Sequence, residues 1–129
     1  MYYPDLSPYS YLGPDSDGSL NVGWLDAEHP FPRGSVPPHL LERILALCFK
    51  AVNYCMGYHT SPFDPSTIVG YSVEHKGNQM SLGNGEIRVP SKSGVMYAAP
   101  TLIYHYIKDC GYLPPQDFLD ALEEMTDPV

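Results

Sequence analysis

The chain has 129 residues, 43% of them apolar, which suits one domain with a modest core and is too apolar for a disordered acidic tail. Its 15 acidic and 7 basic residues give a net charge of −8, which argues against nucleic acid as a partner, because phosphate binding requires clusters of Lys and Arg. No apolar run is as long as a membrane helix and the N-terminus lacks signal-peptide features, so we expect a single cytoplasmic domain, residues 1–129, without a membrane partner.

Turn-forming residues punctuate the first 35 positions, and one short apolar stretch lies between them. Leu20, Val22 and Trp24 alternate with other residues, which predicts a strand with one buried face. Asp17-Gly18 just before this stretch is a hairpin turn signal, so we expect the strand to pair with Tyr9–Leu12. The proline-rich start therefore predicts packed structure rather than a linker.

The clearest helix begins at Pro37-Pro38, since proline is tolerated in a first helical turn. Apolar residues then recur with helical spacing along one stripe: Leu41, Ile44, Leu45, Cys48 and Val52. We expect this long helix to end near Asn53–Gly57.

From Thr67 the apolar pattern changes to a period of two, which indicates antiparallel strands. Four strands with glycine-containing turns are predicted: Ile68–Val73, Gln79–Leu82, Glu86–Pro90 and Val95–Tyr97.

The chain closes with two predicted helices. Pro100 opens the first and Gly111 closes it, while Pro114-Pro115 opens the second. The predicted fold class is α+β: a small antiparallel β-meander of three to five strands packed against one long helix and a C-terminal helical hairpin.

The last helix has an acidic face opposite its apolar one. Its members are Asp117, Asp120, Glu123 and Glu124. Acids late in a helix oppose the helix dipole, so this face is not arranged for stability. Tyr112 lies just before the helix, and tyrosine is enriched in protein interfaces. We therefore expect these five residues to form a binding surface for a basic protein.

A second candidate site combines the loop Trp24–His29 with three side chains from elsewhere in the sequence. Its candidate members are Trp24, Asp26, Glu28, His29, Glu86, Arg88 and His105. In an enzyme, Asp26 or Glu28 would form an acid–base pair with His29, and Arg88 would hold an anionic group.

Each part of that second site also has a structural explanation. Asp26 can cap backbone amides in a turn while Trp24 anchors the core. His105 is expected on the polar side of its helix, where an exposed contact with Asp109 four residues later would explain the pair.

No catalytic signature, phosphate-binding loop or zinc motif is present. The three cysteines, Cys48, Cys55 and Cys110, have spacings that fit neither a disulfide framework nor a zinc site, so we expect free thiols. We therefore assign no catalytic residue, metal or cofactor.

Two strings carry a family resemblance: NVGWLDAEHPF at Asn21–Phe31 and YAAPTLIYHY at Tyr97–Tyr106. Through them the chain resembles a family of small bacterial proteins without established function. Relatives of this kind often carry Gly-x-His-x-Cys-x-x-Cys in the central loop, whereas Ser61 and Asp64 occupy the cysteine positions here. The resemblance implies a bacterial, cytoplasmic, single-domain protein that lacks a soft metal site, and it supplies no reaction.

The acidic charge, the small size and the missing catalytic motifs favour a binding protein over an enzyme. Most concretely, we expect an immunity or antitoxin-like protein that blocks a basic protein partner. The alternative is a small enzyme or ligand-binding protein that uses the Trp24–His29 pocket with Glu86, Arg88 and His105. A third alternative is an accessory subunit, covered by another chain or by its own copy in a homo-oligomer.

Overall fold

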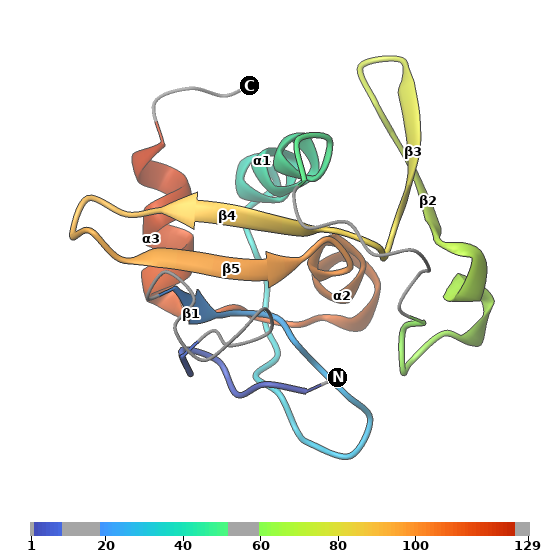
Figure 1. Cartoon of the computed structure of the whole chain (residues 1–129), viewed down its shortest axis with the longest axis horizontal. Helices are drawn as coiled ribbons and strands as arrows, with labels where there is room; N and C mark the ends of the chain where they lie inside the picture. Colours follow the sequence, from blue (N-terminus) through green and yellow to red (C-terminus); the bar gives the residue numbers. More distant parts are fainter. Residues whose placement is uncertain (1, 9–18, 52–59, 126–129) are drawn as a thin grey trace.

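The computed structural model describes residues 2–8, 19–51 and 60–125, and it confirms the α+β fold class. Its helices are α1 (Pro38–Cys48), α2 (Ile103–Cys110) and α3 (Gln116–Glu124), with a 3₁₀ helix, η1, at Pro65–Val69. Its strands are β1 (Leu20–Asn21), β2 (Tyr71–His75), β3 (Asn78–Leu82), β4 (Glu86–Pro90) and β5 (Met96–Pro100). In Figure 1, α3 crosses behind β4 and β5, α1 lies above β4, and the β2–β3 hairpin stands to one side.

The strands form two separate sheets rather than the single meander that we predicted. One sheet has the order β1-β5-β4, with β1 parallel and β4 antiparallel to β5, and the other is the β2–β3 hairpin. The chain turns between the two sheets at Gly83–Gly85. There the Thr101 hydroxyl accepts the N–H of Gly83 at 2.9 Å, and the N–H of Thr101 donates to the carbonyl of Gly85 at 3.0 Å. These bonds hold the turn against the start of α2, so β3 does not continue alongside β4.

The strand predicted from Leu20 is shorter than expected and has a different partner. It pairs in parallel with β5, with Leu20 opposite Tyr97, and the predicted partner Tyr9–Leu12 lies outside the described residues. The regular strand stops before Gly23, whose φ of +82° favours glycine. A Cβ atom there would lie 2.9 Å from the side chain of Ile103, so glycine also permits the close approach of α2.

The first helix also ends earlier than predicted. It stops at Cys48, after which the N–H groups of Phe49 and Lys50 bond to the carbonyls of Ala46 and Leu47 in a tighter turn. The predicted end near Asn53–Gly57 lies outside the described residues. The C-cap of α2 is confirmed, because Gly111 has the left-handed conformation, with φ +76°.

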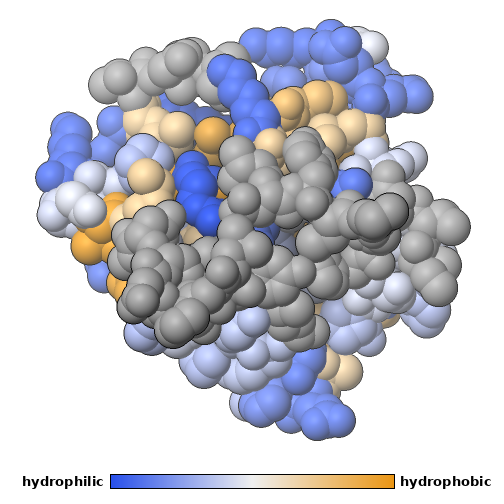
Figure 2. Space-filling model, in the orientation of Figure 1, coloured by the Kyte–Doolittle hydropathy of each residue, from blue (hydrophilic) through white to orange (hydrophobic). Residues whose placement is uncertain are grey.

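The core lies between the three-stranded sheet and the helices. Fully buried apolar side chains meet there from α1, β4 and α3, among them Ile44, Val89, Phe118 and Leu122. The apolar face predicted for the last helix is therefore confirmed. In the view of Figure 2, apolar surface is broken up by hydrophilic side chains, and hydrophilic surface covers the tip of the β2–β3 hairpin. Within the described ranges, no helix has the length and apolar character needed to cross a membrane.

Candidate functional site

Three of the four predicted acids on α3 line one concave surface. Asp117, Asp120 and Glu124 lie on one helical face, since their spacings of three and four residues each correspond to about one turn. They border a hollow of about 340 Å³, to which the β4–β5 turn contributes Ser91 and Ser93. We call this feature the acidic hollow. Its apolar lining consists of Leu6, Leu20, Val95 and Ala121.

The three carboxylates have no ion-pair partner among the described residues. Asp120 accepts a hydrogen bond from the side-chain amide of Gln116 at 2.8 Å, and Glu124 accepts the backbone N–H of Lys92 at 3.1 Å. For Asp117, the described part of the chain offers no hydrogen-bond partner. Negative charge is therefore concentrated around the hollow, and no Lys or Arg of the described ranges forms an ion pair with it.

Tyr97 of β5 also lines the hollow. The residue is 5% exposed, and its ring packs edge-on against Phe118 with 5.9 Å between the ring centroids. Within the described ranges its hydroxyl has no hydrogen-bond partner. Burial raises the pKa of Tyr97, and the charges of Asp117, Glu124 and Asp120 raise it further. The phenol therefore stays neutral, with its oxygen available as a hydrogen-bond acceptor.

The other two members of the predicted acidic surface do not line the hollow. Glu123 points toward α1, where its carboxylate contacts the Nε2 atom of His39. Tyr112 is fully buried, and its hydroxyl donates to the carboxylate of Asp5 at 2.9 and 2.8 Å. Tyr112 thus fastens the N-terminal segment to the core and does not form part of the surface.

In the loop Trp24–His29, Trp24 anchors the core and Asp26 caps backbone amides, as the structural explanation of this loop predicts. Trp24 is 4% exposed, and its Nε1–H donates to the carbonyl of Ala98 at 3.1 Å. The Oδ1 atom of Asp26 accepts the backbone N–H groups of Glu28 and His29 and lies 2.7 Å from the Nδ1 atom of His29. Glu28 and His29 are exposed, so this carboxylate caps a surface turn.

A smaller hollow, of about 90 Å³, lies beside this loop. Trp24, Leu25 and Asp26 line one part of it, and Thr60 and Pro62 line another. Of the seven residues predicted to form a pocket, only Trp24 and Asp26 line this hollow.

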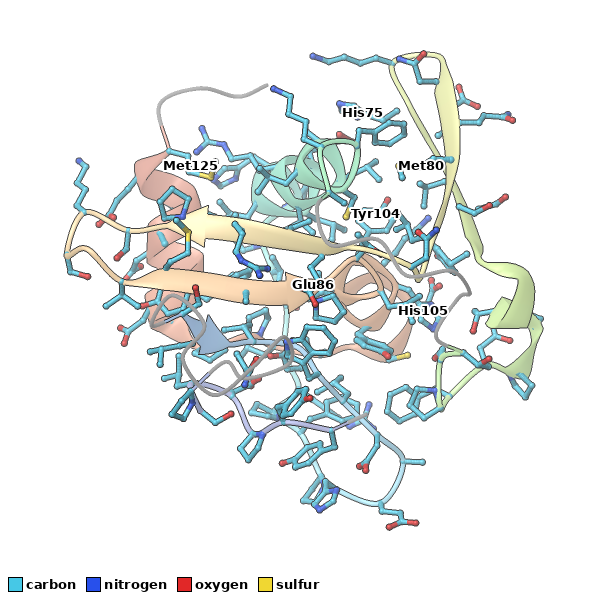
Figure 3. All side chains as sticks on the ribbon, viewed as in Figure 1. His75, Met80, Glu86, Tyr104, His105 and Met125 are labelled. Atoms are coloured by element: carbon cyan, nitrogen blue, oxygen red, sulfur yellow. The ribbon has the colours of Figure 1, made fainter. Side chains whose placement is uncertain are left out.

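The other members of the predicted pocket are distributed over the molecule. Glu86 forms an ion pair of 2.9 Å with Arg88 on the same strand, and the Glu86 side chain is 3% exposed. In Figure 3, Glu86 lies at the start of β4, whereas His105 lies on the side of α2 that faces residues 60–70. Asp26 and His29 therefore meet as the predicted pair, whereas Glu86, Arg88 and His105 do not line the hollow beside their loop.

The prediction that His105 faces solvent is wrong, because the residue is 2% exposed. Its Nδ1 atom lies 2.9 Å from Asp109, as the spacing of four residues predicted, and its Nε2 atom lies 3.0 Å from the Oγ atom of Ser61. The Tyr71 hydroxyl donates to the same Asp109 oxygen at 2.6 Å. We call these four residues the His105 cluster. The segment 60–71 covers this side of α2, and only knowledge of that fold could have placed Ser61 and Tyr71 beside the histidine.

The order hydroxyl, imidazole, carboxylate in the His105 cluster is also that of a serine-nucleophile triad. Ser61 is, however, 2% exposed, and its Oγ atom also accepts the backbone N–H of Phe63 at 3.2 Å. Ser61 does not line either hollow described above. Among the described residues the Oγ atom is thus shielded by packing, and the geometry indicates that the cluster fastens the loop to α2.

Electrostatics keep the carboxylate of this cluster charged. Burial raises the pKa of Asp109, but the hydrogen bonds from Tyr71 and His105 outweigh that effect, so the pKa lies below its ordinary value. Within the ranges that the structure describes, no group of three His, Cys, Asp or Glu side chains is arranged to hold a metal ion. Cys48 and Cys110 are free thiols, and Cys55 lies outside the described residues.

Comparison with known proteins places the chain in one family. A family model described as Domain of unknown function (DUF7919) matches residues 1–123. No curated protein and no solved structure matches the chain.

Proposed function

The chain belongs to the DUF7919 family, whose function is unknown, and we propose that it is a small acidic binding protein that blocks a basic protein partner, as an immunity protein or antitoxin does. The observation that carries this proposal is the acidic hollow, where three carboxylates without an ion-pair partner in the described ranges surround a concave surface. Like charges that are held close together repel one another. Binding a cationic surface would relieve that repulsion.

Charge complementarity also gives this function its physical advantage. A basic partner would be steered toward the net charge of −8 and would associate faster than a neutral one. The setting that we propose is the cytoplasm of a bacterium, in keeping with the free thiols of Cys48 and Cys110, because cytoplasmic thiols are kept reduced.

The proposal is tested by capturing the partner with matched charge reversals. Asp120→Lys places a cation at the acidic hollow, whereas Glu74→Lys makes the same charge change at an exposed position of β2, on the far side of the molecule from α3 (Figure 1). Proteins captured from the native host are identified by mass spectrometry, expressed, and titrated by calorimetry against the wild type and both variants.

We expect a partner with a basic surface that binds the wild type and Glu74→Lys equally. Asp120→Lys should weaken this binding about tenfold or more, because a charge placed against a partner of the same sign costs a kcal/mol or more. Binding of the wild type should also weaken steeply with salt. The proposal is overturned if no basic protein is captured, or if both variants bind equally well. Capture of the chain's own copy alone would instead indicate a homo-oligomer.

A second candidate function is the binding of a small ligand in the hollow beside Trp24. The observation in its favour is that Trp24, Leu25 and Asp26 line this hollow together with Tyr106, so that an apolar wall stands next to a carboxylate. At about 90 Å³ it has room for only a few heavy atoms. Nuclear magnetic resonance screening with small fragments tests this function, and shifts confined to these residues would support it.

A further inference from the structure

We propose that the acidic hollow receives the side chain of one arginine from the partner. This inference rests on the proposed function, because it names the group by which a basic protein would be recognised. It goes beyond general charge attraction, since it predicts that the shape of the cationic group matters as well as its charge.

The size and lining of the hollow fit one long side chain. Its volume of about 340 Å³ is at the lower end of the range for ligand pockets, roughly 300–1,000 Å³. The apolar wall of Leu6, Leu20 and Val95 would cover the methylene groups of an entering side chain, as apolar surfaces commonly do for Arg and Lys. An aromatic side chain would leave the carboxylates without a cation, and a short acidic side chain would leave the apolar wall uncovered and be repelled by the carboxylates.

Hydrogen-bond acceptors lie on two sides of the hollow. From α3 come the carboxylates of Asp117, Asp120 and Glu124, and from β5 comes the hydroxyl oxygen of Tyr97. Tyr97 is the most informative of these residues, because its side chain is almost wholly packed into the protein while the residue still lines the hollow. Within the described residues its hydroxyl has no hydrogen-bond partner. An entering donor would satisfy it.

This distribution of acceptors favours arginine over lysine. A guanidinium group presents five N–H donors in a rigid plane and can bond to acceptors on both sides of the hollow at once. A lysine ammonium has three donors around a single atom and is more strongly hydrated, so it loses more on entering a partly enclosed site. The hydrogen bonds to carboxylates would be charge-assisted and can be bidentate with arginine only.

The test uses three single-residue probes that separate charge from shape. N-acetyl-arginine amide and N-acetyl-lysine amide carry the same charge, and N-acetyl-citrulline amide has nearly the shape of arginine without the charge. Each probe is titrated into the full chain, and the dissociation constant is measured from the backbone amide shifts of β5 and α3. We expect saturable binding of the arginine probe in the millimolar range, about fivefold weaker binding of the lysine probe, and none of the citrulline probe.

Variants then locate the binding. Asp117→Asn and Tyr97→Phe should each weaken the arginine probe about fivefold, because each removes an acceptor from the hollow. Glu74→Gln removes a charge from β2 and should leave binding unchanged. Asp117 is exposed, so its variant remains informative even if Tyr97→Phe alters the packing.

Equal binding of the arginine and lysine probes, or an equal effect of Asp117→Asn and Glu74→Gln, would overturn this inference. So would the absence of saturable binding. These outcomes leave the proposed function standing, because a basic partner could still bind through its overall charge. Failure of the capture experiment would overturn the proposed function separately.

Discussion

The His105 cluster and the acidic hollow both gather polar side chains from distant parts of the sequence, yet they differ in how these side chains are satisfied. In the His105 cluster, each of the four residues bonds to another at 2.6 to 3.0 Å, and Ser61 and His105 are buried. Around the hollow, carboxylates bond only to neutral groups or to none in the described ranges. A closed hydrogen-bond network stabilises the fold, whereas an open set of like charges is available to a partner.

Removing the histidine should have the largest effect on stability. His105→Ala leaves a cavity and deprives Ser61 and Asp109 of their shared partner, so we expect the free energy of unfolding to fall by about 3 kcal/mol. Urea unfolding measures the change. His29→Ala, at an exposed histidine that also contacts an aspartate, is the control and should cost less than about 1 kcal/mol. Equal losses in the two variants would show that the His105 cluster does not hold the fold together.

Ser61→Ala should have the second-largest effect. It removes the hydroxyl that bonds to the Nε2 atom of His105 and accepts the N–H of Phe63, and we expect a loss of about 1 to 2 kcal/mol in urea unfolding. Ser72→Ala, at an exposed position of β2, should change stability by less than about 0.5 kcal/mol. If Ser61→Ala were as stable as the wild type, the serine would not be fastening its loop to α2, and a chemical role would have to be considered again.

Asp109→Asn should have a smaller effect that depends on pH. The folded-state pKa of Asp109 is below its ordinary value, so the charged carboxylate contributes stability above the unfolded pKa of about 4, and this contribution is lost as the pH falls through the folded pKa. Because the side chain is 43% exposed, we expect a loss of at most about 1 kcal/mol at pH 7. The difference from the wild type should shrink below about pH 4 in urea titrations. A difference that did not change between pH 7 and pH 3 would contradict this account.

The sequence predicted local features of the fold better than its long-range contacts. The prolines before α1 and α3, the glycine after α2 and the period of two in the later strands each act within a few residues, and they marked real elements. The strand predicted from Ile68 begins only at Tyr71, however, because Ile68 and Val69 belong to η1. The pairing of β1 with β5 joins residues 77 positions apart, Leu20 and Tyr97, and no local pattern specifies it. The turn between the two sheets is likewise held by a distant residue, since the Thr101 hydroxyl accepts the N–H of Gly83, 18 residues earlier in the sequence.

In the candidate site, too, the sequence predicted local features but not long-range contacts. Asp117, Asp120 and Glu124 were predicted to share a face because they are on one helix, and they do. Tyr97 was missed as a member of the hollow because strand periodicity gives the face of a side chain but not what lies opposite it. The predicted solvent-facing position of His105 was wrong because helical periodicity marked that side as polar, whereas a polar segment containing Ser61 covers it.

The smallest effect on stability is expected at the acidic hollow itself. Asp120→Asn removes one of three neighbouring negative charges and keeps an oxygen that can accept from Gln116, so we expect the free energy of unfolding to rise by no more than about 0.5 kcal/mol. The gain should diminish at 1 M salt, where charges more than about 3 Å apart are screened. A loss of more than about 1 kcal/mol would show that Asp120 supports the fold. A carboxylate whose removal does not weaken the fold, but does weaken partner binding, is retained for binding.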